Sequence, residues 1–324
     1  MKWKKQAINF QFVLKLADRS SGKTVDGQET HMRGCKRGGF ALNYLALLGT
    51  KGGPAIRPGS TMPTAHLLHL EGCPIIIDCG LGVARGLIDQ GVALKDIRHI
   101  FITHLHSDHY LELGPLLHTA WTAGLSNIVQ IYGPAGLDAY WAGFLTSMQA
   151  DIDLRIADEG RPDLRRLVRF HVIDTPDVVQ LGDIQVSALR NIHPPLLDTF
   201  ALSFKTARSH VVFSGDTAYF PDLAGFAQGA DLLVHEAMLE AAIEALLTRV
   251  GNGDERLRAH FYAAHSTAAE AAKIAVAANV KALALNHLIP SDDPDFGEAE
   301  WLAAIRPIWD GPFYLGHDGL RIAF

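Results

Sequence analysis

One short segment, Thr103-His104-Leu105-His106-Ser107-Asp108-His109, constrains the fold and chemistry of this chain more than any other. It follows the apolar run from Ile97 to Ile102 and places three imidazoles and one carboxylate within six residues. The spacing of His104 and His106 is the period of an extended chain and not that of a helix face. The pattern therefore predicts a buried strand that runs out into a loop, with both imidazoles on one side.

The same segment offers a second pair of donor atoms. A turn at Ser107 is expected to carry Asp108 and His109 toward a different point from the first two imidazoles. Zn²⁺ and similar divalent ions take nitrogen and oxygen ligands, so two pairs of donors indicate two adjacent metals. The alternative is a histidine-rich surface loop that binds metal adventitiously. We favour the metal site because H-x-H-x-D-H directly after a buried strand rarely arises by chance, and later segments supply further ligands.

Length and composition limit the class of protein. The chain has 324 residues, of which 48% are hydrophobic, enough for one large α/β domain or two smaller ones. A net charge of −6 argues against broad affinity for nucleic acid. Residues 1–41 are polar and dotted with glycine, and we interpret them as an N-terminal extension of unknown role. Residues 42–324 are predicted to form the folded domain.

The cysteines and the N-terminal sequence indicate the cellular compartment in which the protein is expected. Cys35, Cys73 and Cys79 make an odd count without zinc-finger spacing, so we predict free thiols in a reducing compartment. The basic residues after Met1 are followed by no clean apolar segment of a signal peptide. No apolar run approaches the length of a membrane span. We therefore expect a cytoplasmic protein with no membrane partner.

Strand and helix patterns alternate along the chain and predict an α/β fold. Two β-rich halves, each finishing in strand-helix alternation, fit an αββα sandwich of four layers, with two internal sheets and helices outside. Leu137 to Met148 is predicted to be an amphipathic helix, and Glu236 to Arg249 an Ala-rich helix. The charged segment from Asp151 to Arg169 lacks a clear period and is predicted to be a loop or irregular cap.

Polar residues recur near the ends of buried strands in the second half. Asp216, His235 and His287 each follow an apolar run, and His193 comes soon after another. One such residue is usually a satisfied polar group at a strand end. Because an α/β fold places reactive groups there, four of them beside the histidine motif indicate a shared site.

These features resemble the metallo-β-lactamase-fold hydrolases, and within them the branch of tRNase Z, the bacterial arylsulfatases and related phosphodiesterases. The resemblance runs from about Leu42 to the C-terminus. It is carried by the histidine motif and by the segments Leu48-Gly49-Thr50, Ile77-Asp78-Cys79-Gly80, Tyr132-Gly133-Pro134, His193, Ser214-Gly215-Asp216-Thr217, His235-Glu236-Ala237, His265-Ser266-Thr267 and Asn286-His287.

The resemblance implies a dinuclear metal site with seven ligands. Its two sets would be His104, His106 and His193 for one metal and Asp108, His109 and His287 for the other, with Asp216 bridging them. Two dications about 3.5 to 4 Å apart would be offset by this carboxylate and a bridging hydroxide, which would be the nucleophile. Zinc is the first expectation, with manganese or iron allowed.

The resemblance also implies catalytic roles for Asp108, Glu236 and His265. In tRNase Z the pair that matches Glu236 and His265 assists the leaving group, and the carboxylate orients the imidazole. The alternative for His265 is a helix-capping or buried histidine. His235 and Asp78 are expected to support the site without binding metal.

Two departures weaken the inference that tRNA is the substrate. Residues 194–215 leave no room for the long arm that tRNase Z carries between the positions matching His193 and Asp216. The loop from Pro54 to Gly59 lacks the lysine of the tRNA-processing pattern. We therefore expect a hydrolase of small phosphate (phosphodiester) or sulfate esters, with tRNA less favoured.

Several alternatives stay open. They are an arm-less RNA-processing nuclease, a lactone or thioester hydrolase, and a non-catalytic member that binds a ligand. A cluster of arginines could supply a substitute basic surface for RNA, although a solvated face or a lid is the more common role of such a run; its members are Arg155, Arg161, Arg165, Arg166 and Arg169. Aromatic residues of the Leu137 to Met148 helix could line a pocket for an aromatic ester. The oligomeric state is open, a homodimer being one alternative.

Overall fold

The structure is a computed structural model that describes residues 43–175, 178–251, 255–291 and 293–324. The predicted N-terminal extension lies outside the described residues, so its role and its boundary at residue 41 stay predictions. No helix of the described residues has both the length and the apolar character needed to cross a membrane.

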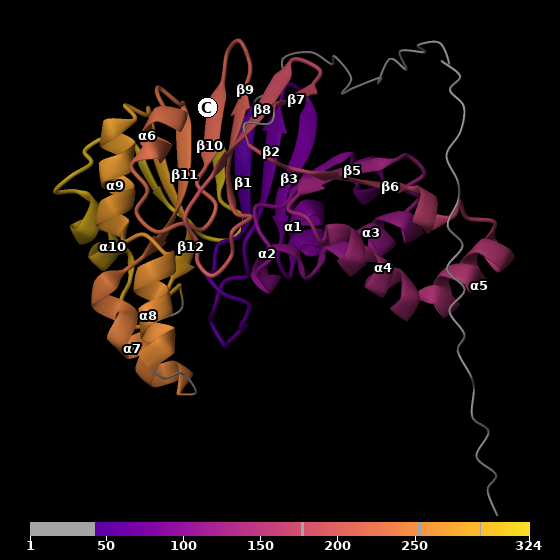
Figure 1. The fold of residues 1–324 in the computed structure, drawn as a ribbon, viewed down its shortest axis with the longest axis horizontal. Helices are drawn as coiled ribbons and strands as arrows, with labels where there is room; N and C mark the ends of the chain where they lie inside the picture. The colour runs from indigo at the N-terminus through magenta and orange to yellow at the C-terminus, as the bar shows by residue number, and fades with distance from the viewer. Residues whose placement is uncertain (1–42, 176–177, 252–254, 292) are drawn as a thin grey trace, which may run out of the picture. The chain divides into compact units, whose positions relative to one another are not determined.

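The described chain forms two seven-stranded sheets (Figure 1). The first has the order β14-β1-β2-β3-β4-β5-β6 and the second the order β13-β12-β11-β10-β9-β8-β7. The strands of the first sheet are β1 (Tyr44–Gly49), β2 (Ala65–Leu70), β3 (Cys73–Cys79), β4 (His99–Phe101), β5 (Val129–Gly133), β6 (Val168–Val172) and β14 (Arg321–Ala323). The strands of the second are β7 (Val178–Leu181), β8 (Ile184–Arg190), β9 (Phe200–Lys205), β10 (His210–Phe213), β11 (Leu232–Met238), β12 (Leu283–Ile289) and β13 (Phe313–Leu315).

Helices follow the strands in both halves. The α-helices are α1 (Val83–Asp89), α2 (Ser107–Tyr110), α3 (Leu113–Thr122), α4 (Leu137–Ser147), α5 (Gln149–Glu159), α6 (Asp222–Phe226), α7 (Ile243–Val250), α8 (Glu255–Ala264), α9 (Ala268–Ala277) and α10 (Glu298–Ile305). Three short 3₁₀ turns are η1 (Leu94–Asp96), η2 (Leu164–Arg166) and η3 (Glu240–Ala242). Figure 1 shows α9 and α10 beside β11 and β12, and α3 and α4 beside β5 and β6.

Side chains alternate in direction along the strands and so pack into different hydrophobic cores, one between the two sheets and one on the outer face of each sheet. On β3, Ile75 and Ile77 lie in the core between the two sheets, whereas Ile76 lies in the outer core formed with α3 and α4. On β11, Leu232 belongs to the inner core and Leu233 to the outer core formed with α9. Successive side chains of a strand point to opposite faces, so each sheet is buried on both sides. The predicted four-layer αββα sandwich is confirmed.

The expectation of a loop between Asp151 and Arg169 is wrong. Its first part belongs to helix α5, in which Ile152 is buried in the outer core. The charged residues that obscured the helical period in the sequence lie on the exposed face of α5. There Arg155 pairs with Asp151 and with Glu159, each four residues away. Such pairs add a few tenths of a kcal/mol each to a helix.

The expected helix from Glu236 to Arg249 begins later than predicted. Residues Glu236 to Met238 belong to β11 and pair with β12, and the chain turns through η3 before α7 begins at Ile243. The local alanine-rich composition favours a helix, but pairing with a parallel neighbour strand overrides that preference.

Two described cysteines differ in state. Cys79 is a free, buried cysteine, as predicted. The prediction of a free thiol is wrong for Cys73, which is disulfide-bonded. Cys35 lies outside the described residues.

We predict that His99 weakens the fold in acid. Burial, with a smaller effect of Arg98, lowers the pKa of His99 to about 4, below the value of about 6.5 in an unfolded chain. The unfolded state therefore binds the proton first, and stability falls as pH drops from 6.5 toward 4. Urea unfolding at pH 7 and pH 5 should show that His99→Phe removes about 2 kcal/mol of the loss between these pH values.

The matched control is His171→Phe, because His171 is exposed and stacks on the same Tyr132 ring. The control should leave the pH dependence of the unfolding free energy unchanged. An equal effect of both variants would contradict the assignment to His99.

Candidate dinuclear metal site

The histidine motif begins where β4 ends, and its first residue fixes the site to the neighbouring strand. The Thr103 amide donates to Asp78 Oδ1 at 2.8 Å, and the Thr103 hydroxyl donates to Asp78 Oδ2 at 2.9 Å. Asp78 ends β3 with a φ of 61°, a conformation that few residues other than glycine adopt. This buried carboxylate therefore joins the ends of two adjacent parallel strands below the motif.

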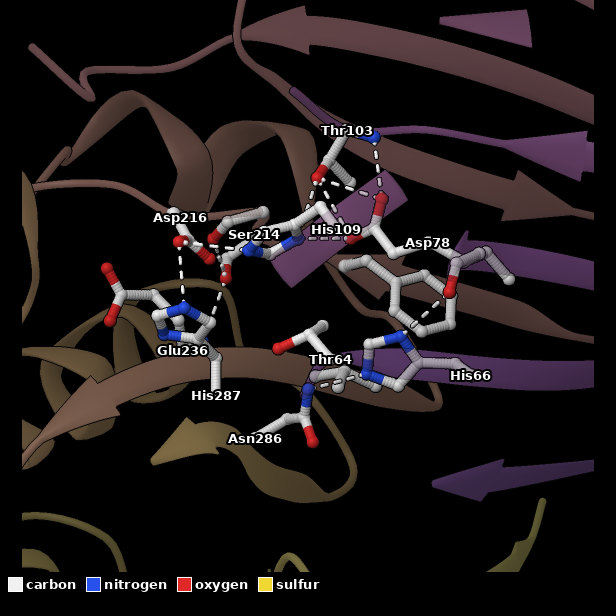
Figure 2. A pocket seen from close by; sticks show the side chains of 14 residues that line it. Thr64, His66, Asp78, Thr103, His109, Ser214, Asp216, Glu236, Asn286 and His287 are labelled. Atoms are coloured by element: carbon white, nitrogen blue, oxygen red, sulfur yellow. Dashed lines mark hydrogen bonds and ion pairs between the residues drawn. The ribbon is translucent and has the colours of Figure 1, made fainter. Parts of the chain in front are cut away.

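The motif continues as predicted. His106 has extended backbone angles, and the short helix α2 begins at Ser107, which brings Asp108 and His109 to a second position. The His109 ring donates from Nδ1 to Asp78 Oδ2 at 2.7 Å (Figure 2). Its Nε2 has no hydrogen-bond partner among the described residues and faces the site, 3.3 Å from Asp216 Oδ2.

The second sheet supplies the remaining predicted ligands, and its strands β10, β11 and β12 are adjacent and parallel. Asp216 lies beyond β10 in the turn after Gly215, whose φ of 58° and close approach to the Phe200 carbonyl leave no room for a side chain. His193 lies in the connection between β8 and β9. Parallel strands end at the same edge, which is why these residues meet.

His287 lies within β12 and not after it, because that strand carries a bulge. Asn286 pairs with Glu236 and Leu288 pairs with Ala237, so His287 is an extra residue without a partner on β11. Its φ is 47°. A bulge re-aims the side chain it carries, and here it directs the imidazole toward Asp216 (Figure 2).

The predicted ligands divide into two groups that are close enough to hold metal ions. The donor atoms within each group lie within 4.8 Å of one another; one group is His104, His106, His193 and Asp216, and the other is Asp108, His109 and His287. Asp216 Oδ2 lies 3.6 Å from His104 Nε2, 3.3 Å from His109 Nε2 and 2.9 Å from His287 Nε2. This one oxygen therefore adjoins both groups, as expected for a bridging ligand.

The tautomers of the imidazoles fit metal ions. His193 Nδ1 donates to the Ala264 carbonyl at 2.7 Å, which leaves the lone pair of its Nε2 free. That Nε2 lies 2.9 Å from His106 Nδ1, which in turn lies 3.2 Å from His104 Nε2. Ring nitrogens of three histidines thus converge on one point, where each neutral imidazole can offer a lone pair to a cation, so the donor set suits a divalent metal.

The charges of the metal-free cluster support the same conclusion. Burial alone would lower the pKa of His287, but Asp216 and Asp108 raise it to about 10. Burial alone would raise the pKa of Asp216, but His287 and His109 hold it well below its usual value. The buried carboxylates therefore require positive charge beside them, which metal ions held by these residues would supply.

The predicted pair Glu236 and His265 lies next to this cluster. His265 Nδ1 is 3.1 Å from Glu236 Oε1, which also accepts hydrogen bonds from the amides of Thr217 and Ser266. Burial lowers the pKa of His265 to about 4 and raises that of Glu236 to about 8. The His265 ring stacks on His287 with 5.3 Å between centroids, and its donor atom forms a further compact group with those of Asp216 and His287, so the pair adjoins the predicted ligands.

The two supporting residues lie outside the ligand groups, in agreement with their predicted roles. Asp78 holds the motif as described. His235 is buried and its Nδ1 donates to the Glu236 carbonyl at 2.6 Å, so its ring faces the backbone of its own strand.

Sequence reasoning missed two contacts of the site. The Gly53 amide donates to Asp108 Oδ2 at 2.8 Å, so the glycine-rich loop after β1 orients a predicted ligand. His260 on α8 lies near His106, His193 and His265, with ring centroids 6.2, 6.0 and 5.7 Å away. The only signal in the sequence was its position one helical turn before Ala264 and the His-Ser-Thr segment.

Comparison with known proteins agrees with this geometry. A model of the family described as "Anti-Pycsar protein Apyc1" matches residues 44–284. A protein named Ribonuclease Z from Mycobacterium sp. (strain KMS) is 31% identical over 288 residues, which cover 86% of this chain and 95% of the relative.

Solved structures share the fold. The metallo-β-lactamase fold protein YhfI from Bacillus subtilis has a TM-score of 0.63 at 20% identity, with 86% of this chain and 99% of that chain covered. The short form of human tRNase Z has a TM-score of 0.60 at 23% identity, with 86% and 98% covered.

Fold, site and relatives together define a metallo-β-lactamase-fold hydrolase of the tRNase Z-like branch. Within that class, the chain belongs to the family described as Anti-Pycsar protein Apyc1.

We predict two divalent ions per chain, because the predicted ligands form two groups and Asp216 Oδ2 adjoins nitrogens of both. Elemental analysis of protein purified without chelators should find about two ions in the unaltered protein and fewer than one in Asp216→Ala, which affects both groups. His193→Ala should retain one ion, because His193 belongs to a single group. At most one ion in the unaltered protein, even after reconstitution, would exclude the dinuclear arrangement.

Proposed function

We propose that this protein hydrolyses phosphodiester bonds with two divalent metal ions, zinc first among them. The observation that carries the proposal is the juxtaposition of two ligand groups sharing Asp216 with the Glu236–His265 pair. Metal ions at these groups would polarise the phosphoryl oxygen and activate a water molecule. Breaking the ester bond then requires a proton for the departing oxygen, and His265 is placed to deliver it.

Other residues of the protein orient the predicted ligands and the predicted proton donor. Asp78 orients His109, and Gly53 orients Asp108, so two ligands are held from behind. Glu236 holds His265 through Nδ1, which directs Nε2 away from the carboxylate. Burial, with the nearby charge of Asp216, raises the pKa of Glu236, and burial lowers that of His265, so both shifts disfavour a fully charged pair.

A small organic substrate is supported by the surface around the site. The arm segment is absent, since residues 194–215 contain only β9, β10 and their connections. The chain segments that carry His193 and Asp216 expose Ile192, Leu197 and Tyr219. Exposed apolar side chains beside a phosphoryl site suit an aryl or nucleobase group on the ester.

Most of the arginine cluster is engaged by acids or carbonyls. Arg155 and Arg165 pair with carboxylates on α5 and next to η2, and Arg161 pairs with Glu159 and with carbonyls at the end of α3. Arg169 donates to the Val168 carbonyl at 2.8 Å. These partners neutralise most of the charge that a substitute RNA surface would need.

The expected aromatic pocket wall on α4 is not supported. Trp141 is buried in the outer core, and the Tyr140 hydroxyl donates to the Leu111 carbonyl and accepts from the Gly114 amide. These side chains hold α4 against the segment around α3. The apolar residues on the loops of the second sheet are the better candidates.

RNA processing is the second candidate, because the similar mycobacterial protein is named Ribonuclease Z. That name gives no support to our expectation that tRNA is the less favoured substrate. A nuclease of this type would use the same metals and the same Glu236–His265 pair. We propose a cytoplasmic location for either activity.

Turnover assays separate the candidates. Metal-loaded protein should hydrolyse aryl phosphodiesters faster than aryl sulfates or lactones, and should cleave pre-tRNA poorly at near-physiological salt. Asp108→Ala and Asp216→Ala should abolish turnover of every substrate. Tight, salt-sensitive binding of pre-tRNA with accurate 3′ cleavage would favour the nuclease and contradict the small-substrate proposal.

We predict that His265→Ala slows esters with poor leaving groups by about 100-fold or more but slows p-nitrophenyl esters only a few-fold, because an activated phenolate leaves without a proton. The measurement is kcat over a series of phosphodiesters of rising leaving-group pKa. Glu236→Gln should show the same selectivity in weaker form. Equal slowing of activated and unactivated esters would contradict the general-acid role.

A further inference from the structure

His260 is an imidazole near the predicted metal ligands to which neither the sequence nor the similar proteins assign a role. It lies on α8, four residues before Ala264, so both residues face the same side of the helix. The Ala264 carbonyl accepts from His193 Nδ1 at 2.7 Å. That bond ties this face of α8 to a predicted ligand and fixes where His260 stands.

The ring of His260 lies at the edge of the site and is half-buried. Its centroid is 6.0 Å from that of His193, 6.2 Å from that of His106 and 5.7 Å from that of His265. The His193 and His265 rings are themselves 5.0 Å apart, so the three rings form a triangle and His260 adjoins both the group that holds His193 and the residue proposed to protonate the leaving oxygen. A ring at this place is within reach of a phosphoryl group that contacts both neighbours.

The hydrogen bonding of His260 differs from that of its neighbours. His193, His265 and His109 each use Nδ1 for a partner in the protein, namely a carbonyl or a carboxylate. His260 makes no hydrogen bond to any residue in the described part of the chain. Polar groups that are partly buried are normally paired, so the partner of this ring comes from solution or from the substrate.

One alternative role for His260 is that of a further metal ligand, and the geometry does not support it. None of the described donor groups compact enough to share an ion includes His260. A second general acid is the other alternative. Among the residues that the structure describes, no carboxylate forms an ion pair with His260, in contrast to the Glu236 contact of His265.

We propose that His260 binds the substrate by donating an N–H hydrogen bond to a non-bridging phosphoryl oxygen. An imidazole keeps at least one N–H in every tautomer, so this role does not depend on its titration. The proposal rests on the phosphodiesterase function proposed above. It assigns His260 to recognition of the phosphoryl group, while His265 acts on the leaving oxygen.

The test compares two kinds of substitution in the metal-loaded protein. His260→Phe keeps an aromatic ring and removes the donor, whereas His260→Gln and His260→Asn place an amide N–H near the positions of Nε2 and Nδ1. A hydrogen bond to a charged group contributes roughly 1.5 to 3 kcal/mol, equivalent to about 10- to 100-fold in affinity. Calorimetric titration with inorganic phosphate and KM for an aryl phosphodiester are the two readouts.

We expect His260→Phe to weaken phosphate binding and raise KM by about 10-fold or more, with metal content unchanged. At least one of the two amide variants should stay within about threefold of the unaltered protein. The control His171→Phe replaces an exposed histidine on β6 and should change neither readout.

Three results would overturn the proposal. These are unchanged phosphate affinity in His260→Phe, loss of metal from that variant, and equal weakening by phenylalanine and both amides. Failure of the proposed function is a separate outcome, seen as absent phosphodiester turnover by the unaltered protein. In that case the phosphate titration alone still decides whether His260 binds the anion.

Discussion

The site depends on one buried oxygen. Asp216 Oδ2 stands within 3.6 Å of ring nitrogens from His104 and His109 of the histidine motif and from His287 on β12. A carboxylate taken out of water is costly unless positive charge surrounds it. The surrounding imidazoles and the ions they are suited to bind supply that charge, so this carboxylate and its ligand groups stabilise one another or fail together.

The framework holds these groups with backbone conformations that ordinary strands avoid. Asp78 and His287 both have positive φ angles, and Gly215 occupies a turn too tight for a side chain. Such a backbone conformation costs of order 1 to 3 kcal/mol in a residue that carries a side chain. It persists because the surrounding structure fixes it. Burial of the apolar strands on both faces supplies the compensating free energy. The strained residues lie at the ends and bulges of those strands, where the stable framework meets the reactive groups.

Much of the fold and most of the proposed ligands could be predicted from sequence, because both are encoded by short-range patterns. The His104 to His109 spacing and the apolar runs before Asp216 and His287 are local signals. Helix α5 was missed because exposed ion pairs masked its period, and the end of β11 because pairing with β12 overrides local propensity. His260 and Gly53 were missed because their roles depend on which segments the two sheets bring together, and single-sequence spacing carries no such information.

Each of the two ligand groups draws from both halves of the chain. The motif after β4 belongs to the first sheet, whereas His193, Asp216 and His287 belong to the second. An ion bound at either group is therefore a cross-link between the two halves of the sandwich, closed only after both have formed and docked. Its binding free energy includes the free energy of that docking. A metal ion held at these groups would thus also act as a clamp across the seam between the two sheets.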